Sequence, residues 1–415
     1  EPPNDQIQVL ADWLETLPNM VKGELLAGFE AFGVPLDLLP FLSAALTIAP
    51  ILSIFPLLFA LTTVFERKGL ARIQNRYGPN RVGIPLTNIR LAGFGQFIAD
   101  GIKSLTKEDL VPRAADKMLH FLAPVVLFIP VALTFSVLPF GRDLVPIDID
   151  AGLLFFFAVS GSAELAIFMA GWSSRNKYSM LGAMRAIAQM ISYEVPLILS
   201  TVVVVMATGS LSLVDIVERQ AQAGGIGISL WNVFTPWGVL GAVLFFIAML
   251  AESNRSPFDL PEGESELVAG YFTEYSGFKF ALFVMAEYLG LFAAMGVGIT
   301  LFLGGWSSPF AFAPFTWIPT WGWFMLKLVT GIFLVIWIRG TMPRMRMDQL
   351  MKFAWKFMLP LSVVNILVFG AVHYIDSLTI QWIIATAVLG FAWHRMGIAL
   401  AGSQPPAARV YRYAE

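Results

Sequence analysis

The segment from Ala251 to Glu266 packs five carboxylates into a short link between two apolar stretches. They are Glu252, Asp259, Glu262, Glu264 and Glu266. Like-charged carboxylates held together in a partly dry site cannot all ionise, so at least one should exchange protons near neutral pH. The alternative is a solvated acidic loop. Proton transfer is favoured because the flanking apolar stretches contribute Glu252 itself and also Glu287.

Composition shows what surrounds these acids. Hydrophobic residues make up 57% of the 415 residues, charged residues 13%, and the mean hydropathy is +0.71, as in integral membrane proteins. A net charge of −2 argues against a nucleic-acid partner. The absence of cysteine excludes disulfides and cysteine-bound iron–sulfur clusters, and three scattered histidines do not predict a metal site. Any redox centres therefore belong to partner proteins.

Apolar segments joined by polar links predict an all-α, polytopic transmembrane helix bundle. We expect core spans near 44–65, 119–138, 153–171, 188–208, 237–251, 281–303, 322–341 and 357–375. The predicted organisation is an eight-span core over 44–375, between an N-terminal extension (1–43) and a C-terminal extension (376–415) with a ninth span near 379–400. Helical spacing of apolar residues in the N-terminal extension predicts an amphipathic helix on the outer surface.

Lysine and arginine concentrate in alternate links, at 66–118, 172–187, 252–280 and after 339. The positive-inside rule then places the N-terminus outside and these four links in the cytoplasm or the mitochondrial matrix. With this orientation the acids within spans all lie in the inner half of the membrane or at its edge. A proton path built from them enters from the inner side and must leave sideways, into a neighbouring membrane subunit.

The first charged link begins at Glu66 and turns amphipathic near Phe94. Its apolar stripe, with Asp100 and Lys103 off the stripe, predicts a helix lying in the membrane interface. Its positive charges suit lipid-headgroup anchoring. The alternative is a docking collar for a soluble partner, with a polar mouth that admits a lipid-soluble substrate.

Several long motifs resemble those of one membrane-subunit family of NADH–quinone oxidoreductase, the family of the H subunit in bacteria and of subunit 1 of mitochondrial NADH dehydrogenase. They are Glu66-Arg67-Lys68 with Arg76-Tyr-Gly-Pro-Asn-Arg-Val-Gly83, Gly171-Trp-Ser-Ser174, Gln189-Met-Ile-Ser-Tyr-Glu-Val195, the acidic link 251–268, Met285-Ala-Glu-Tyr288 and Trp337-Ile-Arg339. They follow one another from about residue 45 to about residue 375, with the family's order and spacing.

The resemblance implies a place in respiratory complex I, in the bacterial cytoplasmic (inner) membrane or the mitochondrial inner membrane. There the subunit joins the peripheral quinone-site and iron–sulfur subunits to the small and antiporter-like membrane subunits. It implies ubiquinone or menaquinone as substrate, with FMN and iron–sulfur clusters in partner subunits and no directly catalytic residue in this chain. Reduction of the quinone would shift the protonation of the acids, and the shift would spread sideways.

The resemblance also assigns roles to residues. Glu66, Arg67 and Asp100 would line a quinone chamber or its entrance, with Glu252 and Arg255 near its inner end. A proton path would begin with Glu194, Glu252, Glu262, Glu264, Glu266 and Glu287, and Arg339 and Arg344 would pair with these acids. Glu164 joins the path by its depth alone. The alternative for Glu164 is a carboxyl hydrogen-bonded between helices.

Two other functions fit parts of the sequence. One is the membrane anchor of a related membrane-bound hydrogenase or ferredoxin-linked complex, which needs no quinone. The completeness of the Glu66 motif and the acidic link favours the quinone enzyme. The other is a stand-alone proton-coupled transporter, which the lack of acids in the outer half and of an inverted repeat argues against.

Overall fold

A computed structural model of the chain describes residues 3–31, 35, 38–83, 92–142, 144–222, 229–260, 268–310, 315–375 and 377–401. The helices it contains are α1 (Pro3–Ala31), α2 (Leu39–Ile73), α3 (Gln96–Thr106), α4 (Lys117–Thr134), α5 (Gly152–Ser160), α6 (Ala163–Ser173), α7 (Lys177–Thr208), α8 (Leu213–Ala221), α9 (Pro236–Glu252), α11 (Gly277–Phe302), α12 (Thr320–Thr341), α13 (Met347–Phe353), α14 (Leu359–Val372) and α15 (Leu378–Ala401). Short 3-10 turns include η3 (Asn232–Phe234) and η4 (Gly270–Phe272), and a π-helical turn, Ala354–Met358, joins α13 to α14.

The predicted polytopic all-α bundle is confirmed. In the described part, eight helical segments are long and apolar enough to cross a membrane, among them Thr379–Leu400 near the C-terminus. The 17-residue α9 is apolar but shorter, about 26 Å long at 1.5 Å per residue. The bundle therefore offers the eight core spans expected from the sequence, with α9 the shortest of them, and a ninth.

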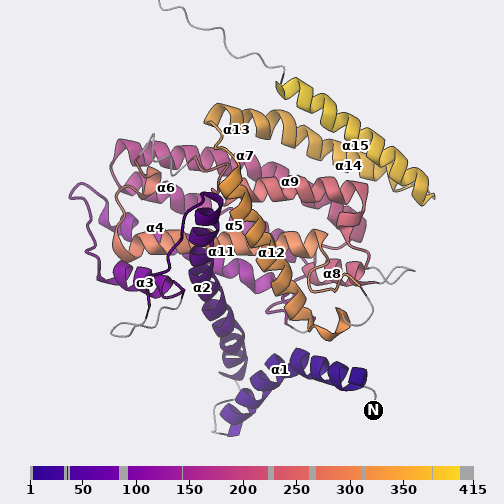
Figure 1. Cartoon of the computed structure of the whole chain (residues 1–415), viewed down its shortest axis with the longest axis horizontal. Helices are drawn as coiled ribbons and strands as arrows, with labels where there is room; N and C mark the ends of the chain where they lie inside the picture. The colour runs from indigo at the N-terminus through magenta and orange to yellow at the C-terminus, as the bar shows by residue number, and fades with distance from the viewer. Residues whose placement is uncertain are drawn as a thin grey trace, which may run out of the picture.

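Contacts between α4, α6, α7, α9 and α11 form the centre of the bundle (Figure 1). Small residues let these helices approach closely, as is common between membrane helices. A Cβ atom added to Gly171 of α6 would lie only 2.4 Å from the Cβ of Ala183 on α7. Helices α2 and α12 pack against each other and cross the central helices obliquely (Figure 1).

Several spans have other bounds than the sequence predicts, and for two of them the packing shows why. Helix α2 continues past residue 65 to Ile73, because the charged Glu66 is satisfied by partners on other helices and need not leave the bundle. The span predicted over 153–171 is two helices, α5 and α6, separated at Gly161 and Ser162. Glycine is a poor helix former, and here it makes room for a polar side chain of α7.

Helix α1 contacts both α2 and α12 at one end of the bundle. α1 lies across the start of α2, and its Lys22 donates a hydrogen bond to Thr47 at 2.7 Å (Figure 1). The hydroxyl of Thr320, the first residue of α12, donates to Glu15 of α1 at 2.7 Å. α15 packs on α14 and α9 along the opposite flank. The N-terminal ends of α2 and α12 therefore lie near α1, and their charged C-terminal ends lie away from it.

Candidate functional site

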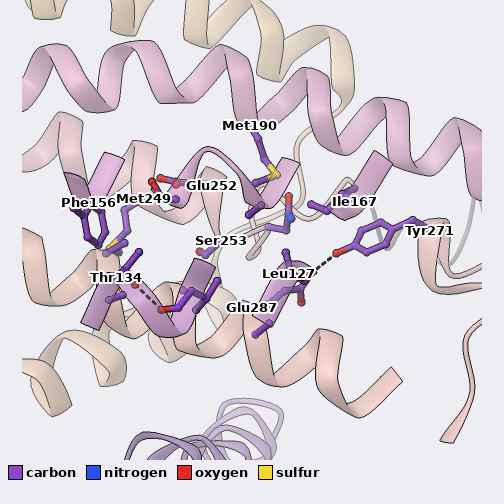
Figure 2. A pocket seen from close by; sticks show the side chains of 18 residues that line it. Leu127, Thr134, Phe156, Ile167, Met190, Met249, Glu252, Ser253, Tyr271 and Glu287 are labelled. Carbon is purple, nitrogen blue, oxygen red and sulfur yellow. Dashed lines mark hydrogen bonds between the residues drawn. The ribbon is translucent and has the colours of Figure 1, made fainter. Parts of the chain in front are cut away.

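A partly open cavity of about 70 Å³ lies between α4, α5, α6, α7, α9 and α11 (Figure 2). Its walls are mostly apolar, and the polar exceptions are Glu252, Glu287, Tyr271, Asn254, Ser253, Ser160 and Thr134. We call it the acid cavity. Liquid water occupies roughly 30 Å³ per molecule, so the cavity has room for on the order of two waters between the two carboxylates. Glu252 and Glu287, predicted from sequence to belong to one path, thus line one internal space.

Tyr271 fixes the carboxylate of Glu287. The phenol is fully buried and donates a hydrogen bond to Oε1 of Glu287 at 2.6 Å (Figure 2). Its backbone is pressed against α7, because a Cβ atom on Gly182 would lie 2.7 Å from the Cα of Gly270. Ser179 of α7 also donates to the carbonyl of Tyr271 at 3.3 Å. The donor to Glu287 therefore sits on a backbone that cannot shift without moving α7.

Glu252 closes α9 and points into the same cavity (Figure 2). Its Oε2 atom is buried and has no hydrogen-bond partner among the described residues. A carboxylate oxygen without a partner is costly in apolar surroundings, so this atom calls for a proton or a water molecule. That requirement suits a group that exchanges protons.

Glu194 and Glu164 extend the acids sideways from Glu252. A Cβ atom on Gly161 would lie 3.0 Å from Oε1 of Glu194, so the break between α5 and α6 accommodates this carboxyl group. Glu164 and Glu194 are half-buried, and both lie close enough to Glu252 for their charges to interact. The structure therefore brings Glu164, Glu194, Glu252 and Glu287 into one neighbourhood.

A second cluster surrounds Glu66, which is only 5% exposed and lies two turns before the end of α2. Arg339 of α12 forms an ion pair with Glu66, and the hydroxyl of Tyr288 donates to its other carboxylate oxygen. The guanidinium of Arg255 lies 3.8 Å from the centre of the Tyr288 ring, within range of a cation–π interaction. We call Glu66, Arg255, Tyr288 and Arg339 the junction cluster.

A larger pocket of about 610 Å³ opens between α2, α3, α11 and the segment around η4. Its walls are mainly apolar and include Phe59, Phe97, Phe272, Phe278, Phe280 and Met285. The volume lies within the roughly 300–1,000 Å³ typical of small-molecule sites. An ion pair between Arg67 and Asp100, 2.6 Å long, joins α2 to α3 beside this pocket. We call it the α3 pocket.

The phenol of Tyr275 belongs to the wall of the α3 pocket, in the link before α11. Burial raises the pKa of Tyr275 to about 12, partly offset by a hydrogen bond with Ser173. The ring stacks on His120 with the two ring centres 4.0 Å apart. Tyr275 therefore stays protonated at physiological pH and serves this wall as a neutral side chain.

The structure groups the predicted site residues partly differently from the sequence prediction. Arg67 and Asp100 line the α3 pocket, whereas Glu66 lies behind it in the junction cluster. Arg339 pairs with Glu66, a residue assigned from sequence to the chamber, and not with an acid of the proton path. Arg344 donates to the carbonyl of Leu260 at 3.4 Å. Glu262, Glu264 and Glu266 lie outside the described residues.

Two tyrosines were not assigned roles from sequence, although both contact site carboxylates. Tyr288 follows Glu287 directly in the Met285–Tyr288 motif, which was the available signal. No feature of the sequence pointed to Tyr271, because its contact with Glu287 depends on how η4 folds onto α7. Within the described ranges, no group of three or more His, Asp or Glu side chains could hold a metal ion.

Comparison with known proteins gives a match between residues 46–370 and the family described as NADH dehydrogenase. A relative from Geobacillus kaustophilus (strain HTA426), named as the H subunit of NADH-quinone oxidoreductase, is 48% identical over 307 residues, covering 74% of this chain and 87% of the relative. A protein of the same name from Dehalococcoides mccartyi (strain CBDB1) is 47% identical over 303 residues, covering 73% and 79%. The matched family region contains the acid cavity and the junction cluster.

Proposed function

This chain belongs to the family of the H subunit of NADH-quinone oxidoreductase. We propose that it binds the quinone of complex I and couples the reduction of that quinone to proton transfer along a path of carboxylates. The α3 pocket would be the quinone's route from the membrane. The acid cavity would be the start of the proton path. The relatives' shared name favours the quinone enzyme over a hydrogenase anchor or a stand-alone transporter.

The α3 pocket suits a lipid-soluble substrate with a polar head. Apolar side chains from α2, α3 and α11 make most of its wall, while Arg67 and Asp100 supply charge on one side. α3 has no buried residue, and its Ile98, Ile102 and Leu105 are exposed, as expected of a helix lying in the lipid interface. A quinone in the membrane can therefore reach the pocket without crossing water.

One observation carries the coupling role. Glu287 and Tyr288 are consecutive residues of α11, and each belongs to a different polar cluster. Tyr288 contacts Glu66, whose neighbour Arg67 lines the α3 pocket, while Glu287 lines the acid cavity. A charge change at the quinone can therefore act on Glu66 and Tyr288 and, one residue away, on the proton affinity of Glu287.

Electrons would come from iron–sulfur clusters and FMN in peripheral-arm subunits, which would complete the quinone chamber. Protons would leave the acid cavity towards neighbouring small and antiporter-like membrane subunits. Glu194 and Glu164, on the α7 and α6 side of Glu252, mark the direction of that path within this chain. Glu262, Glu264 and Glu266 belong to the same proposal on sequence grounds alone.

We also propose which side of the membrane each end of the bundle faces. α1 meets the N-terminal ends of α2 and α12, whereas Glu66 and Arg339 lie near their C-terminal ends. This separation supports a charged cytoplasmic or matrix side and an outer side that carries α1, which lies within the N-terminal extension 1–43. The core 44–375 would hold both sites, and the C-terminal extension 376–415 would add α15 at the flank.

The test uses the intact complex, purified through a tag on this chain and assayed for NADH-driven reduction of a short-chain quinone. Activity that a quinone-site inhibitor blocks supports the proposal. Reconstitution into vesicles then measures proton uptake per electron. A complex that reduces no quinone, or that reduces quinone without moving protons in any membrane preparation, would contradict it.

A further inference from the structure

Lys327 is a cation of the described bundle that the proposed function does not use. It lies on α12, two turns from its N-terminal end, and all its recorded hydrogen bonds go to backbone carbonyls. Its Nζ donates to Leu303 at 2.7 Å, to Gly305 at 2.8 Å and to Ser307 at 2.7 Å. Three neutral oxygens thus converge on one nitrogen at nearly equal distances.

The backbone that carries these oxygens is shaped for convergence. Helix α11 ends at Phe302, and Gly304 and Gly305 follow with φ angles of 68° and 51°. A Cβ atom on Gly304 would lie 2.4 Å from the side chains of Ser307 and Trp231, and one on Gly305 would lie 2.5 Å from Val217. Both positions require glycine, because a larger residue would have a strained φ angle and would clash with these neighbours. The resulting turn points the three carbonyl oxygens towards the same place.

The neighbouring polar side chains bind other carbonyls of α11 and do not compete with Lys327 for these oxygens. Gln220 donates to the carbonyl of Thr300 at 2.8 Å, and Asn232 donates to that of Leu301 at 2.7 Å. The carbonyl of Leu303, directly after the last residue of α11, has no intrahelical donor and lies at the negative end of the helix dipole. A cation is therefore favoured at this point, and Lys327 provides it.

The fourth side of the site is aromatic. The ammonium lies 4.2 Å from the centre of the Trp231 ring, which is held by a hydrogen bond of 3.0 Å from its Nε1 to Ser307. No carboxylate in the described ranges forms an ion pair with Lys327. Converging carbonyls without a counter-charge are how proteins replace the hydration shell of monovalent cations.

We propose that residues 303–307 and Trp231 form a carbonyl cage for a monovalent cation, that Lys327 fills it as a tethered cation, and that this closes the outer end of α11 to mobile cations such as hydronium. The cage lies sixteen residues beyond Glu287, about 24 Å along α11. The closing role rests on the proposed function, since it matters only where protons gather at Glu287. The cage itself does not depend on that function.

The first test opens the cage. Intact complex carrying K327A is heated in choline, potassium or ammonium chloride at equal ionic strength, and aggregation of the tagged chain is followed by immunoblot. We expect a lower midpoint temperature in choline, with at least half of the loss recovered in potassium or ammonium. K327M, which fills the space without charge, should be destabilised and should respond to none of the salts.

Wild type and R142A, which removes an exposed outer-loop cation, should show no dependence on the choice of salt. A K327A midpoint equal to wild type in choline, or equally low in all three salts, would overturn the cage. If K327A does not assemble, K327M decides the matter. A K327M midpoint equal to that of wild type shows that the carbonyls need no cation.

The second test measures closure. Inhibitor-blocked complex in vesicles is given a pH gradient, and internal acidification is followed with a trapped dye. We expect K327A to leak protons at least threefold faster than wild type, with K327M close to wild type. Salt-dependent stability with a wild-type leak rate retains the cage and overturns its closing role. Neither readout needs quinone turnover, so failure of the proposed function is distinguishable.

Discussion

Glu287 and Tyr288 are neighbours on α11 whose side chains belong to separate hydrogen-bonded groups. Glu287 accepts from Tyr271 in the acid cavity, and Tyr288 donates to Glu66 in the junction cluster. Successive helical residues point about 100° apart, so one turn of α11 serves both groups. A change of charge in one group, or a movement of α11, can therefore affect the other.

Replacing Tyr288 by phenylalanine keeps the ring beneath Arg255 and removes the donor to Glu66. Hydrogen bonds to charged groups contribute about 1.5–3 kcal/mol, so the charge on Glu66 should be markedly less well stabilised. We expect inhibitor-sensitive quinone reduction to fall roughly tenfold, with normal assembly on native gels. Tyr374→Phe, at a tyrosine that is 86% exposed, is the control. Equal activity in both variants would remove Tyr288 from the mechanism.

Replacing Glu287 by glutamine keeps the acceptor for Tyr271 and removes the titrating group. We expect coupled quinone reduction to fall at least roughly tenfold, as when a proton-transfer group is lost, while the complex still assembles. Glu194→Gln should act in the same direction. Glu218→Gln, on the exposed face of α8, is the matched control. Wild-type proton uptake per electron in assembled E287Q would exclude a relay role there.

Breaking the ion pair between Arg67 and Asp100 should change the access of quinone to the α3 pocket more than it changes the rate of the reaction. The two side chains are 50% and 33% exposed, so solvent screens the pair and its worth is about 0.2–1 kcal/mol. We expect R67Q and D100N each to raise the KM for a short-chain quinone about twofold to fivefold, with kcat little changed.

The double variant R67Q/D100N should be no worse than the poorer single variant, because the second change removes a partner already lost. Arg72→Gln, one turn beyond on α2, controls for loss of positive charge. An effect confined to kcat, or fully additive effects, would show that the pair does not act as a unit at the pocket.

Replacing Gly182 by alanine tests whether η4 is fixed by close packing on α7. The added Cβ atom would lie 2.7 Å from the backbone of Gly270, so the segment carrying Tyr271 must move. Overpacking of this kind costs about 1–3 kcal/mol, and we expect both a lower yield of complex and lower activity in what assembles. Gly28→Ala meets nothing within 4 Å and should behave as wild type. Full activity in assembled G182A would show that the position of Tyr271 is not critical.

The sequence was sufficient for the approximate places of the spans, because membrane burial leaves long apolar runs, and each carboxylate stands out within such a run. It was insufficient for pairings between distant helices. Glu66 and Arg339 are 273 residues apart, and only packing of α2 against α12 brings them together. Periodicity also predicted one span over 153–171, and one membrane-length segment, Gly152–Ser173, lies there. The break within it at Gly161 was not predicted, because it serves Glu194 on another helix and leaves no mark in local hydropathy.

The size of the acid cavity has a consequence for ion selectivity. Sodium carries a shell of several waters, and six of them alone would occupy on the order of 180 Å³ at the volume of liquid water. The cavity holds about 70 Å³. A proton needs no such shell, because it can move between carboxylates by exchange along one or two waters. A sodium ion entering the acid cavity would therefore have to leave most of its water shell outside, whereas a proton would not.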